Sequence, residues 1–240
     1  MRVMLTRPRA DSERLAKELQ ARGNVVVIEP MLNIVPQGLI PPLDDVAALI
    51  VTSANSIRTF AAACDRRDLI VYAVGDATAL VASEVGFTAV ESAQGDAVAL
   101  EAHITAQVKP GAGSLLHIQG RDVTGELDES LISKGYNVRS AVMYRAETAN
   151  ELFQEARDLL VSRNIDVILF FSPRTVKTFV RLVSEAGLAD RCDTIIAICL
   201  SAAVAEAGSA LIWSGVHSAA TPDRAAMLQL CDAVQESGQT

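Results

Sequence analysis

The stretch LIVTSANSIRTF at residues 49–60 decides the fold class of this chain. An apolar run leads into a hydroxyl-rich turn and then into a helical segment, which is typical of a buried parallel strand followed by a helix. A second copy, LFFSPRTVKTF, occupies residues 169–179, and both copies end in Thr-Phe. Short β-rich runs alternate with helical segments along the rest of the chain. The sequence therefore predicts an α/β protein with parallel sheets.

The predicted strands follow from the apolar runs. They lie at about residues 2–6, 24–28, 47–52, 70–74, 88–91, 114–118, 137–143, 165–171, 194–199 and 210–213. The runs at 47–52 and 165–171 are apolar almost throughout, so we expect these two strands in the centres of sheets.

Further stretches are also repeated, but in a different order. VYAVGDATAL at 71–80 resembles IIAICLSAAV at 195–204, which pairs Gly75 with Cys199, and the unit at 3–25 resembles the one at 116–137. The unit at 3–25 opens the chain, whereas its counterpart at 116–137 comes after the other units of its copy, as after a circular permutation. We expect one lobe of residues 37–145, inserted into another of residues 1–36 plus 146–240. A weak repeat produced by the fold class alone is the alternative.

Composition restricts the classes of function. The 29 acidic and 21 basic residues give a net charge of −8, which argues against a nucleic-acid-binding face. The cysteines Cys64, Cys192, Cys199 and Cys231 form no C-x-x-C pair or zinc pattern, so a reducing cytoplasm fits best. No apolar run is long enough for a signal peptide or a membrane span, and we expect no membrane partner.

Candidate binding residues lie in the turns after the predicted strands. In parallel sheets ligands bind at the carboxyl ends of strands, where helix N-termini favour anions. The candidates are Thr6, Arg7, Ser53, Asn55, Ser56, Gly75, Asp76, Gly120, Arg121, Ser172, Arg174 and Ser201. Each hydroxyl alone is more commonly a helix cap, and each arginine alone is as readily a surface charge. Together they predict a cleft between the lobes that binds a ligand with several carboxylates or phosphates.

Tyr144 is the candidate catalytic residue. It ends the last predicted strand of the inserted lobe, just before the chain returns to the other lobe, and its phenol can donate a proton. An aromatic ring packed against the hinge is the alternative. The chain has no G-x-G-x-x-G or G-x-x-x-x-G-K-[ST] motif, and its histidines share no ligand spacing, so we expect neither a cofactor nor a metal. His117 is interpreted as part of a strand interior.

At these residues the sequence resembles the uroporphyrinogen-III synthase family. The likeness covers nearly the whole chain, and the stretches that carry it are 6–8, 51–56, 71–79, 120–121, 131–135, 142–145 and 170–173. The resemblance implies two flavodoxin-like lobes joined by a two-stranded linker. One departure is the turn at 198–201, which reads Ile-Cys-Leu-Ser where the family usually has Ile-Gly followed by a Thr.

The resemblance also implies the reaction. Linear hydroxymethylbilane would lose its terminal hydroxyl as water, and the resulting azafulvene would close through a spiro intermediate that inverts the last ring, without cofactor or metal. Tyr144 matches the tyrosine proposed to assist departure of the hydroxyl. A monomer in transient contact with the preceding enzyme, hydroxymethylbilane synthase, is expected. A non-catalytic two-lobed module for a small anionic metabolite is the alternative function, because it too predicts a hinged cleft.

Overall fold

The computed structural model describes residues 1–123 and 125–237. The chain divides into two compact units. Unit 1 consists of Met1–Asn33 and Glu147–Thr240, and unit 2 consists of Ile34–Ala146. The chain therefore passes from one unit to the other twice, and the inserted lobe that we expect at 37–145 falls within unit 2.

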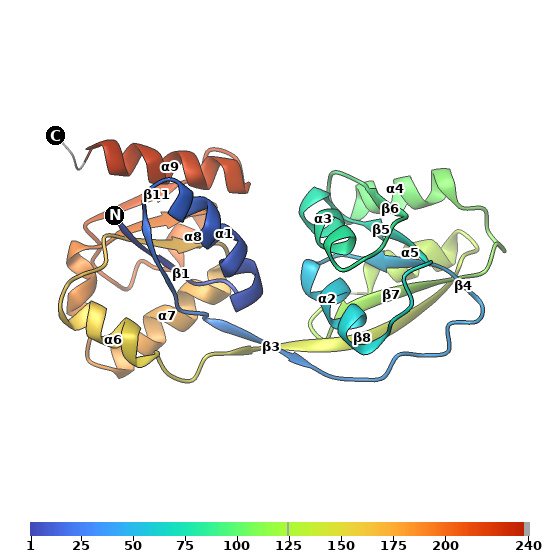
Figure 1. Ribbon diagram of the computed structural model, residues 1–240, viewed down its shortest axis with the longest axis horizontal. Coiled ribbons are helices and arrows are strands. Elements are labelled where there is room, and N and C mark those ends of the chain that lie inside the picture. Colours follow the sequence, from blue (N-terminus) through green and yellow to red (C-terminus); the bar gives the residue numbers. More distant parts are fainter. Residues whose placement is uncertain (124, 238–240) are drawn as a thin grey trace. The chain divides into compact units, whose positions relative to one another are not determined.

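Unit 1 is built around a five-stranded sheet (Figure 1). Its strands are β1 (Arg2–Leu5), β2 (Val25–Ile28), β9 (Val167–Phe170), β10 (Ile196–Cys199) and β11 (Gly215–Ser218). Its helices are α1 (Arg9–Ala21), α6 (Gln154–Val161), α7 (Pro173–Glu185), α8 (Ala202–Glu206) and α9 (Arg224–Ser237), with a 3-10 helix η1 (Ala189–Thr194). The strands are parallel in the order β11-β10-β9-β1-β2. Numbered within the unit this is 2-1-3-4-5 from the β2 edge, the flavodoxin-like order.

Helices cover both faces of the unit 1 sheet (Figure 1). On one face Leu19 of α1 and Met227 of α9 pack against Leu5 and other strand residues. On the other face, residues of α6, α7 and α8 pack against strand residues that include Phe170. Phe179 of α7 belongs to this second layer and is fully buried. Burial of β9 on both faces explains its uninterrupted apolar sequence.

Unit 2 contains a six-stranded sheet. Its strands are β3 (Leu32–Pro36), β4 (Val46–Val51), β5 (Ile70–Ala73), β6 (Val90–Ser92), β7 (Ser114–Gly120) and β8 (Asn137–Thr148), and its helices are α2 (Ala54–Ala63), α3 (Asp76–Glu84), α4 (Ala97–Gln107) and α5 (Glu126–Ser133). The order is β3-β8-β7-β4-β5-β6. Helices α2 and α3 pack on one face of this sheet, and α4 and α5 pack on the other. The two passages between the units fall within β3 and β8.

The two sheets have the same strand order once the permutation is taken into account. If β4-β5-β6-β7-β8 is matched to β9-β10-β11-β1-β2, each strand of one sheet has the same neighbours as its equivalent in the other, apart from the additional strand β3 beside β8. The helices that follow the equivalent strands β1 and β7 also end alike. Gly23 and Gly135 both have positive φ, of 82° and 88°, as a left-handed helix end requires. The permuted repeat read from the sequence is therefore present in the fold.

The stretches at 49–60 and 169–179 fold in the same way. Ser53 and Ser172 cap α2 and α7, and each accepts a hydrogen bond from the backbone N–H three residues later. Thr59 and Thr178 each donate a hydroxyl hydrogen bond to the carbonyl four residues earlier, at 2.7 and 2.9 Å. The following phenylalanines are fully buried. In the shared Thr-Phe ending, the threonine is therefore kept for its hydrogen bond and the phenylalanine for its packing in the core.

Two sequence-based expectations are wrong in detail. The pairing of Gly75 with Cys199 is shifted by two positions, because the residue that caps α8 is Ser201, the equivalent of the α3 cap Gly75. Residues 210–213 form no strand, since the last strand of unit 1 is β11. Only Leu211 and Trp213 of this run pack against the core, and the ring of Trp213 stacks on Phe179 with centroids 6.0 Å apart.

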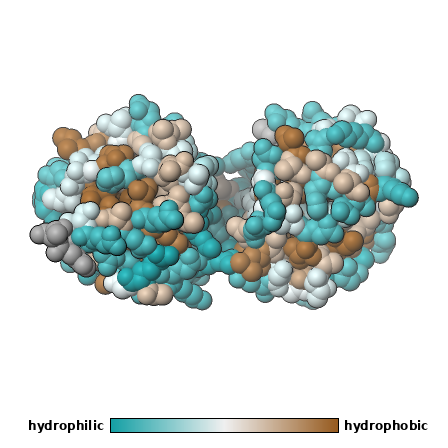
Figure 2. Space-filling view, turned by 90° about the horizontal axis from the view of Figure 1, so that it is seen from above, coloured by the Kyte–Doolittle hydropathy of each residue, from teal (hydrophilic) through white to brown (hydrophobic). Residues whose placement is uncertain are grey.

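The surface carries residues of both kinds. On the face shown in Figure 2, hydrophobic residues of each unit lie among hydrophilic ones. Leu39 and Ile212, 91% and 77% exposed, are the most exposed large hydrophobic side chains among the described residues. Over the part of the chain that the structure describes, none of the helices has the length and apolar character needed to cross a membrane.

Candidate functional site

In each sheet there is one point at which the connections that follow two neighbouring strands lead toward opposite edges of the sheet. In unit 1 this point lies between β1 and β9, and in unit 2 it lies between the equivalent strands β7 and β4. In open parallel sheets the crevice beyond the carboxyl ends of these two strands is the usual ligand site. The predicted residues Thr6, Arg7 and Ser172 follow β1 and β9, and Gly120, Arg121 and Ser53 lie at the ends of β7 and β4.

In unit 2 this point brings a phenol and a serine hydroxyl together. The Oη atom of Tyr144 lies 3.0 Å from Oγ of Ser53, although the two residues are far apart in sequence. Ser53 also accepts a hydrogen bond of 3.2 Å from the backbone N–H of Ser56. That bond occupies one acceptor site of the hydroxyl and orients it at the start of α2. Tyr144 is only 9% exposed, so its hydroxyl has a fixed position at the edge of the sheet.

Gly120 leaves the space that the Tyr144 ring occupies. A Cβ atom at Gly120 would lie 2.7 Å from Cζ and 3.0 Å from Oη of Tyr144. Such distances are shorter than a van der Waals contact, so any side chain here would displace the ring. The backbone N–H of Arg121 donates to the carbonyl of Tyr144 at 2.9 Å, next to the register shift between β7 and β8 at Gly120. The glycine of the predicted Gly-Arg pair is therefore required for packing against the phenol.

The Arg121 side chain is held at the same edge by the segment that follows β3. Its Nη2 atom donates to Oε1 of Gln37 at 3.2 Å, and the Gln37 backbone N–H donates to the carbonyl of Met143 at 2.9 Å. Gly38 has a positive φ of 77°, and a Cβ there would lie 2.3 Å from the carbonyl oxygen of Val142. The loop therefore lies directly against β8, and its Gln37 side chain accepts from the Arg121 guanidinium. Gln37 was not predicted as a site residue.

The other predicted residues of unit 2 differ in their surroundings. Asn55 is half-buried and accepts a hydrogen bond from Arg58 at 3.2 Å. Ser56 is fully buried, its backbone N–H donates to Oγ of Ser53, and its own Oγ lies 3.3 Å from that atom. Gly75 caps α3 at the next strand end, and Asp76 accepts a hydrogen bond of 2.6 Å from Ser92. Asp76 is thus tied to its own loop, and its negative charge does not suit an anionic ligand.

In unit 1 the two predicted residues after β1 differ, because Thr6 is buried and Arg7 is partly exposed. The hydroxyl of Thr6 is fully buried and donates to the carbonyl of Leu169 at 2.7 Å, so its side chain joins β1 to β9 and does not face a ligand. The Arg7 guanidinium lies over the ring of Phe171, 5.0 Å from its centroid, and pairs with Asp11 at 3.0 Å. Arg7 is therefore held at the strand ends with part of its charge exposed.

Ser172 and Arg174 line a pocket at the start of α7. Its volume is about 630 Å³, and it is lined by Thr148, Ser172, Pro173, Arg174, Lys177, Thr178 and Arg181. Three of these side chains are cationic, which is notable in an acidic protein. Sequence reasoning missed Thr148, Lys177 and Arg181. The spacing of the cations at positions 174, 177 and 181 places them on one side of a helix and could have indicated them.

Ser201 caps α8 and accepts a hydrogen bond from the backbone N–H of Val204 at 3.4 Å. The neighbouring Cys199 is buried at the end of β10, and burial raises the pKa of its thiol to about 11. A thiol with this pKa is protonated at neutral pH and is a poor nucleophile. The turn that departs from the family pattern therefore contributes a cap and not a reactive group.

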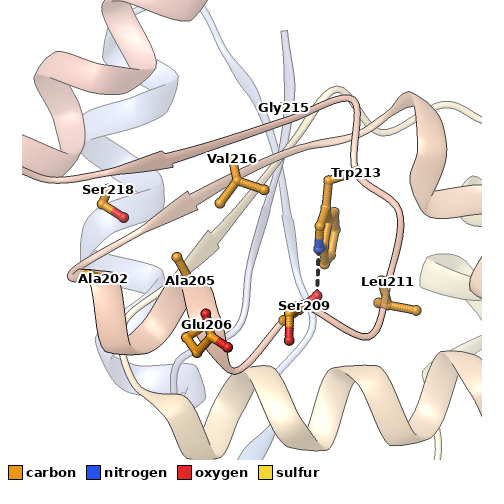
Figure 3. Close-up of a pocket in the computed structure, with 10 residues that line it drawn as sticks. Ala202, Ala205, Glu206, Ser209, Leu211, Trp213, Gly215, Val216 and Ser218 are labelled. Carbon is orange, nitrogen blue, oxygen red and sulfur yellow. Dashed lines mark hydrogen bonds between the residues drawn. The ribbon is translucent and has the colours of Figure 1, made fainter.

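A second pocket of unit 1 has a different character (Figure 3). It lies between α8 and β11, has a volume of about 420 Å³, and is lined mostly by small and apolar residues. Trp213 forms one wall, and its indole N–H donates to the carbonyl of Gly208 at 3.0 Å. Glu206 is the one charged residue among those that line it. This pocket offers an anion no cationic partner.

A buried polar network lies behind the unit 2 edge. Nδ1 of His117 is 2.6 Å from Oδ1 of Asp128, and Ser140 donates to Oδ2 of Asp128 at 2.5 Å. On the other side of the ring, Nε2 lies 3.4 Å from Oγ1 of Thr52, the residue before Ser53. Burial acts to raise the pKa of Asp128, but the hydrogen bonds from His117 and Ser140 outweigh it and lower that pKa. His117 is thus a strand-interior histidine, as predicted.

Among the described residues, no group of three or more His, Cys, Asp or Glu side chains is arranged to hold a metal ion. In unit 2, hydroxyls, a guanidinium and the N-terminus of α2 lie at the strand ends, and in unit 1, hydroxyls, guanidiniums and the N-terminus of α7 do so. Neither of these helices has an acidic residue in its first turn. Each set of groups has the chemistry to bind carboxylates, and that of unit 2 also has a phenol.

The fold defines a class: a two-unit α/β protein with flavodoxin-like sheets. The sequence model of the family described as uroporphyrinogen-III synthase HemD matches residues 13–229, so the chain belongs to the uroporphyrinogen-III synthase family. A uroporphyrinogen-III synthase of Chlorobaculum parvum is 27% identical over 202 residues, which span 78% of this chain and 81% of that protein. The crystal structure of uroporphyrinogen-III synthetase from Helicobacter pylori matches with a TM-score of 0.64 and 16% identity. That match covers 98% of this chain and 100% of the other, and it concerns the fold.

Proposed function

We propose that this protein is a uroporphyrinogen-III synthase, which closes hydroxymethylbilane into a macrocycle with loss of water and inversion of the last ring. The observation that carries the proposal is the Tyr144 phenol held 3.0 Å from Ser53, where the ends of β4 and β7 meet the side of β8 in unit 2. The family model, which spans most of the chain, supports the same activity. In this proposal the strand ends bind the substrate, and Tyr144 is the general acid.

Tyr144 is proposed to assist departure of the terminal hydroxyl. Tyrosine phenols carry their proton at neutral pH, and a phenol beside a leaving hydroxyl can donate that proton as water departs. Ser53 orients the phenol, because its own hydroxyl is already fixed by the Ser56 backbone N–H. Gly120 leaves the phenol room to stay there. The electrophilic azafulvene then forms next to residues that hold its carboxylates.

Binding is proposed to involve the strand ends of both units. Hydroxymethylbilane carries four acetate and four propionate side chains, so it needs many donors. Unit 2 offers Ser53, Asn55, the backbone at Gly75, and Arg121, and the Ser56 backbone N–H is left out because it donates to Ser53. Unit 1 offers Arg7, Ser172, Arg174 and Ser201, and the Thr6 side chain is left out of this set because it is buried. Charge-assisted hydrogen bonds to carboxylates are the stronger kind and favour this arrangement.

Positioning is proposed to supply most of the selectivity. The open substrate can close without the enzyme to the uninverted isomer, so the protein must hold one folded conformer and favour one transition state. Two passages of the chain between the units allow the units to close on a ligand that contacts both. We further propose that the protein acts in the cytoplasm as a monomer and receives its unstable substrate through transient contact with hydroxymethylbilane synthase.

A coupled assay tests the proposed function. Hydroxymethylbilane is generated enzymatically in the presence of the purified protein, and the uroporphyrinogen isomers are separated after oxidation. The proposal predicts isomer III in excess over isomer I. Isomer I alone, at the rate seen without the protein, would reject the proposal and favour a non-catalytic module that binds a small anionic metabolite.

A further inference from the structure

The outer face of α7 presents a row of cations. Arg174, Lys177 and Arg181 are exposed, whereas Val176 and Phe179 between them are buried against the sheet. Positions 174, 177 and 181 follow the spacing that places residues on one side of a helix. At a rise of about 1.5 Å per residue, the row is roughly 10 Å long. This length suits several carboxylates of one ligand better than a single ion.

The row borders a cavity and not a flat surface. The pocket of about 630 Å³ at α7 is lined by all three cations together with residues that include Thr148, Ser172 and Thr178. Arg181 is fixed there, because its guanidinium donates to the carbonyl of Ala149 and pairs with Glu185 at 2.9 Å. The wall of the pocket thus has a defined shape and a net positive charge. In a protein with a net charge of −8, this grouping favours a ligand with several negative charges.

The start of α7 adds to this preference. Ser172 caps the helix, and the first turn holds Arg174 but no acidic residue. A cation in the first turn is disfavoured by the helix dipole, whereas an anion bound there is favoured. A carboxylate at this point would offset the unfavourable placement of Arg174. The helix start and the row of cations therefore favour the same chemical class of ligand.

We infer that Lys177 and Arg181 extend the unit 1 binding edge along α7 into a carboxylate subsite. The identity of the ligand, a tetrapyrrole with acetate and propionate side chains, rests on the proposed function. Ser172 and the helix start bind one carboxylate, and Lys177 and Arg181 bind another farther along the helix. These two residues act in binding and not in the chemical step, so they set substrate affinity and the preference for an acid-bearing chain.

Binding of a stable octacarboxylate tests the inference directly. Uroporphyrin III serves as the probe, and its fluorescence is titrated with the wild-type protein and with variants. Lys177→Met removes the charge and keeps the length of the chain, and we expect Kd to rise about tenfold. Lys177→Arg retains the charge and should bind within about twofold of wild type. Arg181 also supports the backbone at Ala149, so Lys177 is the more informative position.

Lys17→Met is the matched control, because Lys17 is an exposed lysine of α1, on the opposite face of the unit 1 sheet. It should leave Kd unchanged, and added salt should weaken wild-type binding more than binding by Lys177→Met. Wild-type affinity in Lys177→Met, equal weakening by Lys17→Met, or no binding by the wild-type protein would each overturn the inference. The isomer assay on the wild-type protein judges the proposed function separately. In that assay Lys177→Met should raise KM about tenfold with kcat retained.

Discussion

The hydroxyl of Ser53, at the carboxyl end of β4, lies 3.0 Å from the phenol oxygen of Tyr144 in β8. Strand β7 separates these two strands in the sheet, and at its end the chain has Gly120. A glycine in the intervening strand is what permits the contact, because the phenol passes over it at a distance that no side chain would allow. Tyr144 lies within β8 and does not end it as predicted, so the catalytic proposal depends on the ends of β4 and β7 meeting the side of β8.

Replacement of Tyr144 by phenylalanine should lower the turnover number about ten- to a hundredfold and leave folding almost unchanged. The ring still fills the space beside Gly120, and only the proton donor is lost. The turnover number for isomer III and the thermal unfolding temperature are to be measured together. Tyr136→Phe is the control, because that phenol donates to the carbonyl of Val108 at 2.7 Å, away from the strand ends. Wild-type turnover in Tyr144→Phe would remove Tyr144 from the chemical step.

Gly120→Ala should reduce activity to about the level of Tyr144→Phe, because the new methyl group displaces the phenol. A Cβ at this position lies 2.7 Å from the Tyr144 ring. Gly125→Ala is the matched control, since the nearest atom to its Cβ is 3.8 Å away. Steady-state kinetics of both variants give the comparison, and the double variant with Tyr144→Phe should lose little more. Independent, additive losses would show that Gly120 acts in some other way.

The stability of unit 1 should fall as pH rises through neutrality because of Glu29. Glu29 is 1% exposed, and burial raises the pKa of its carboxyl from 4.5 to about 7 despite the hydrogen bond from the Phe153 N–H. The folded state therefore binds this proton more tightly than the unfolded state. The resulting stabilisation is complete below about pH 4.5 and is lost as pH rises through about 7. The nearby charges of Arg9, Arg157 and Glu155 modify the effect but do not reverse it.

Glu29→Gln should remove this pH dependence. The amide oxygen can still accept from Phe153, while the charge that forms above neutrality is gone. Free energies of unfolding in urea between pH 4 and pH 8 should show the variant about 2 kcal/mol more stable than wild type at pH 8, after allowance for partial solvation. The two proteins should agree near pH 4. Parallel curves over the whole range would show that Glu29 has an ordinary pKa.

Asp128→Asn should destabilise unit 2 by about 2–3 kcal/mol at neutral pH, because it weakens a buried network with His117 and Ser140. The pKa of Asp128 is lowered in the folded state, so its contribution is present above the ordinary value of 3.8 and is lost as pH falls below it. The difference in unfolding free energy between variant and wild type should therefore shrink in acid. Asp65→Asn, at an exposed position, should show no such effect. A pH-independent difference would contradict this account.

The fold could be predicted from sequence because it is repeated in sequence. The copies at 49–60 and 169–179 keep a capping serine, a bonded threonine and a buried phenylalanine, and each of these positions has a local physical cause. The strand at 210–213 was mispredicted because apolar residues can pack in a loop as well as in a strand. Trp213 does so against Phe179, and periodicity does not distinguish the two cases over so short a run.

The candidate site was only partly predictable. The turns after strands are found from the order of elements, but the use of each hydroxyl depends on its neighbours in three dimensions. Thr6 and Ser53 look alike in sequence, yet one is buried against Leu169 and the other faces a phenol. Lys177 and Arg181 were missed because a charged helix face is usually only a solvated surface. Only the cavity beside α7 sets them apart.

We propose that one tetrapyrrole contacts the strand ends of both units. Hydrogen exchange measured by mass spectrometry, on the wild-type protein with and without uroporphyrin III, tests it most directly. The account predicts slower exchange in both residues 52–58 of unit 2 and residues 172–178 of unit 1, with the outer faces of α4 and α9 unaffected. Protection confined to one unit, or absent from both segments, would contradict it.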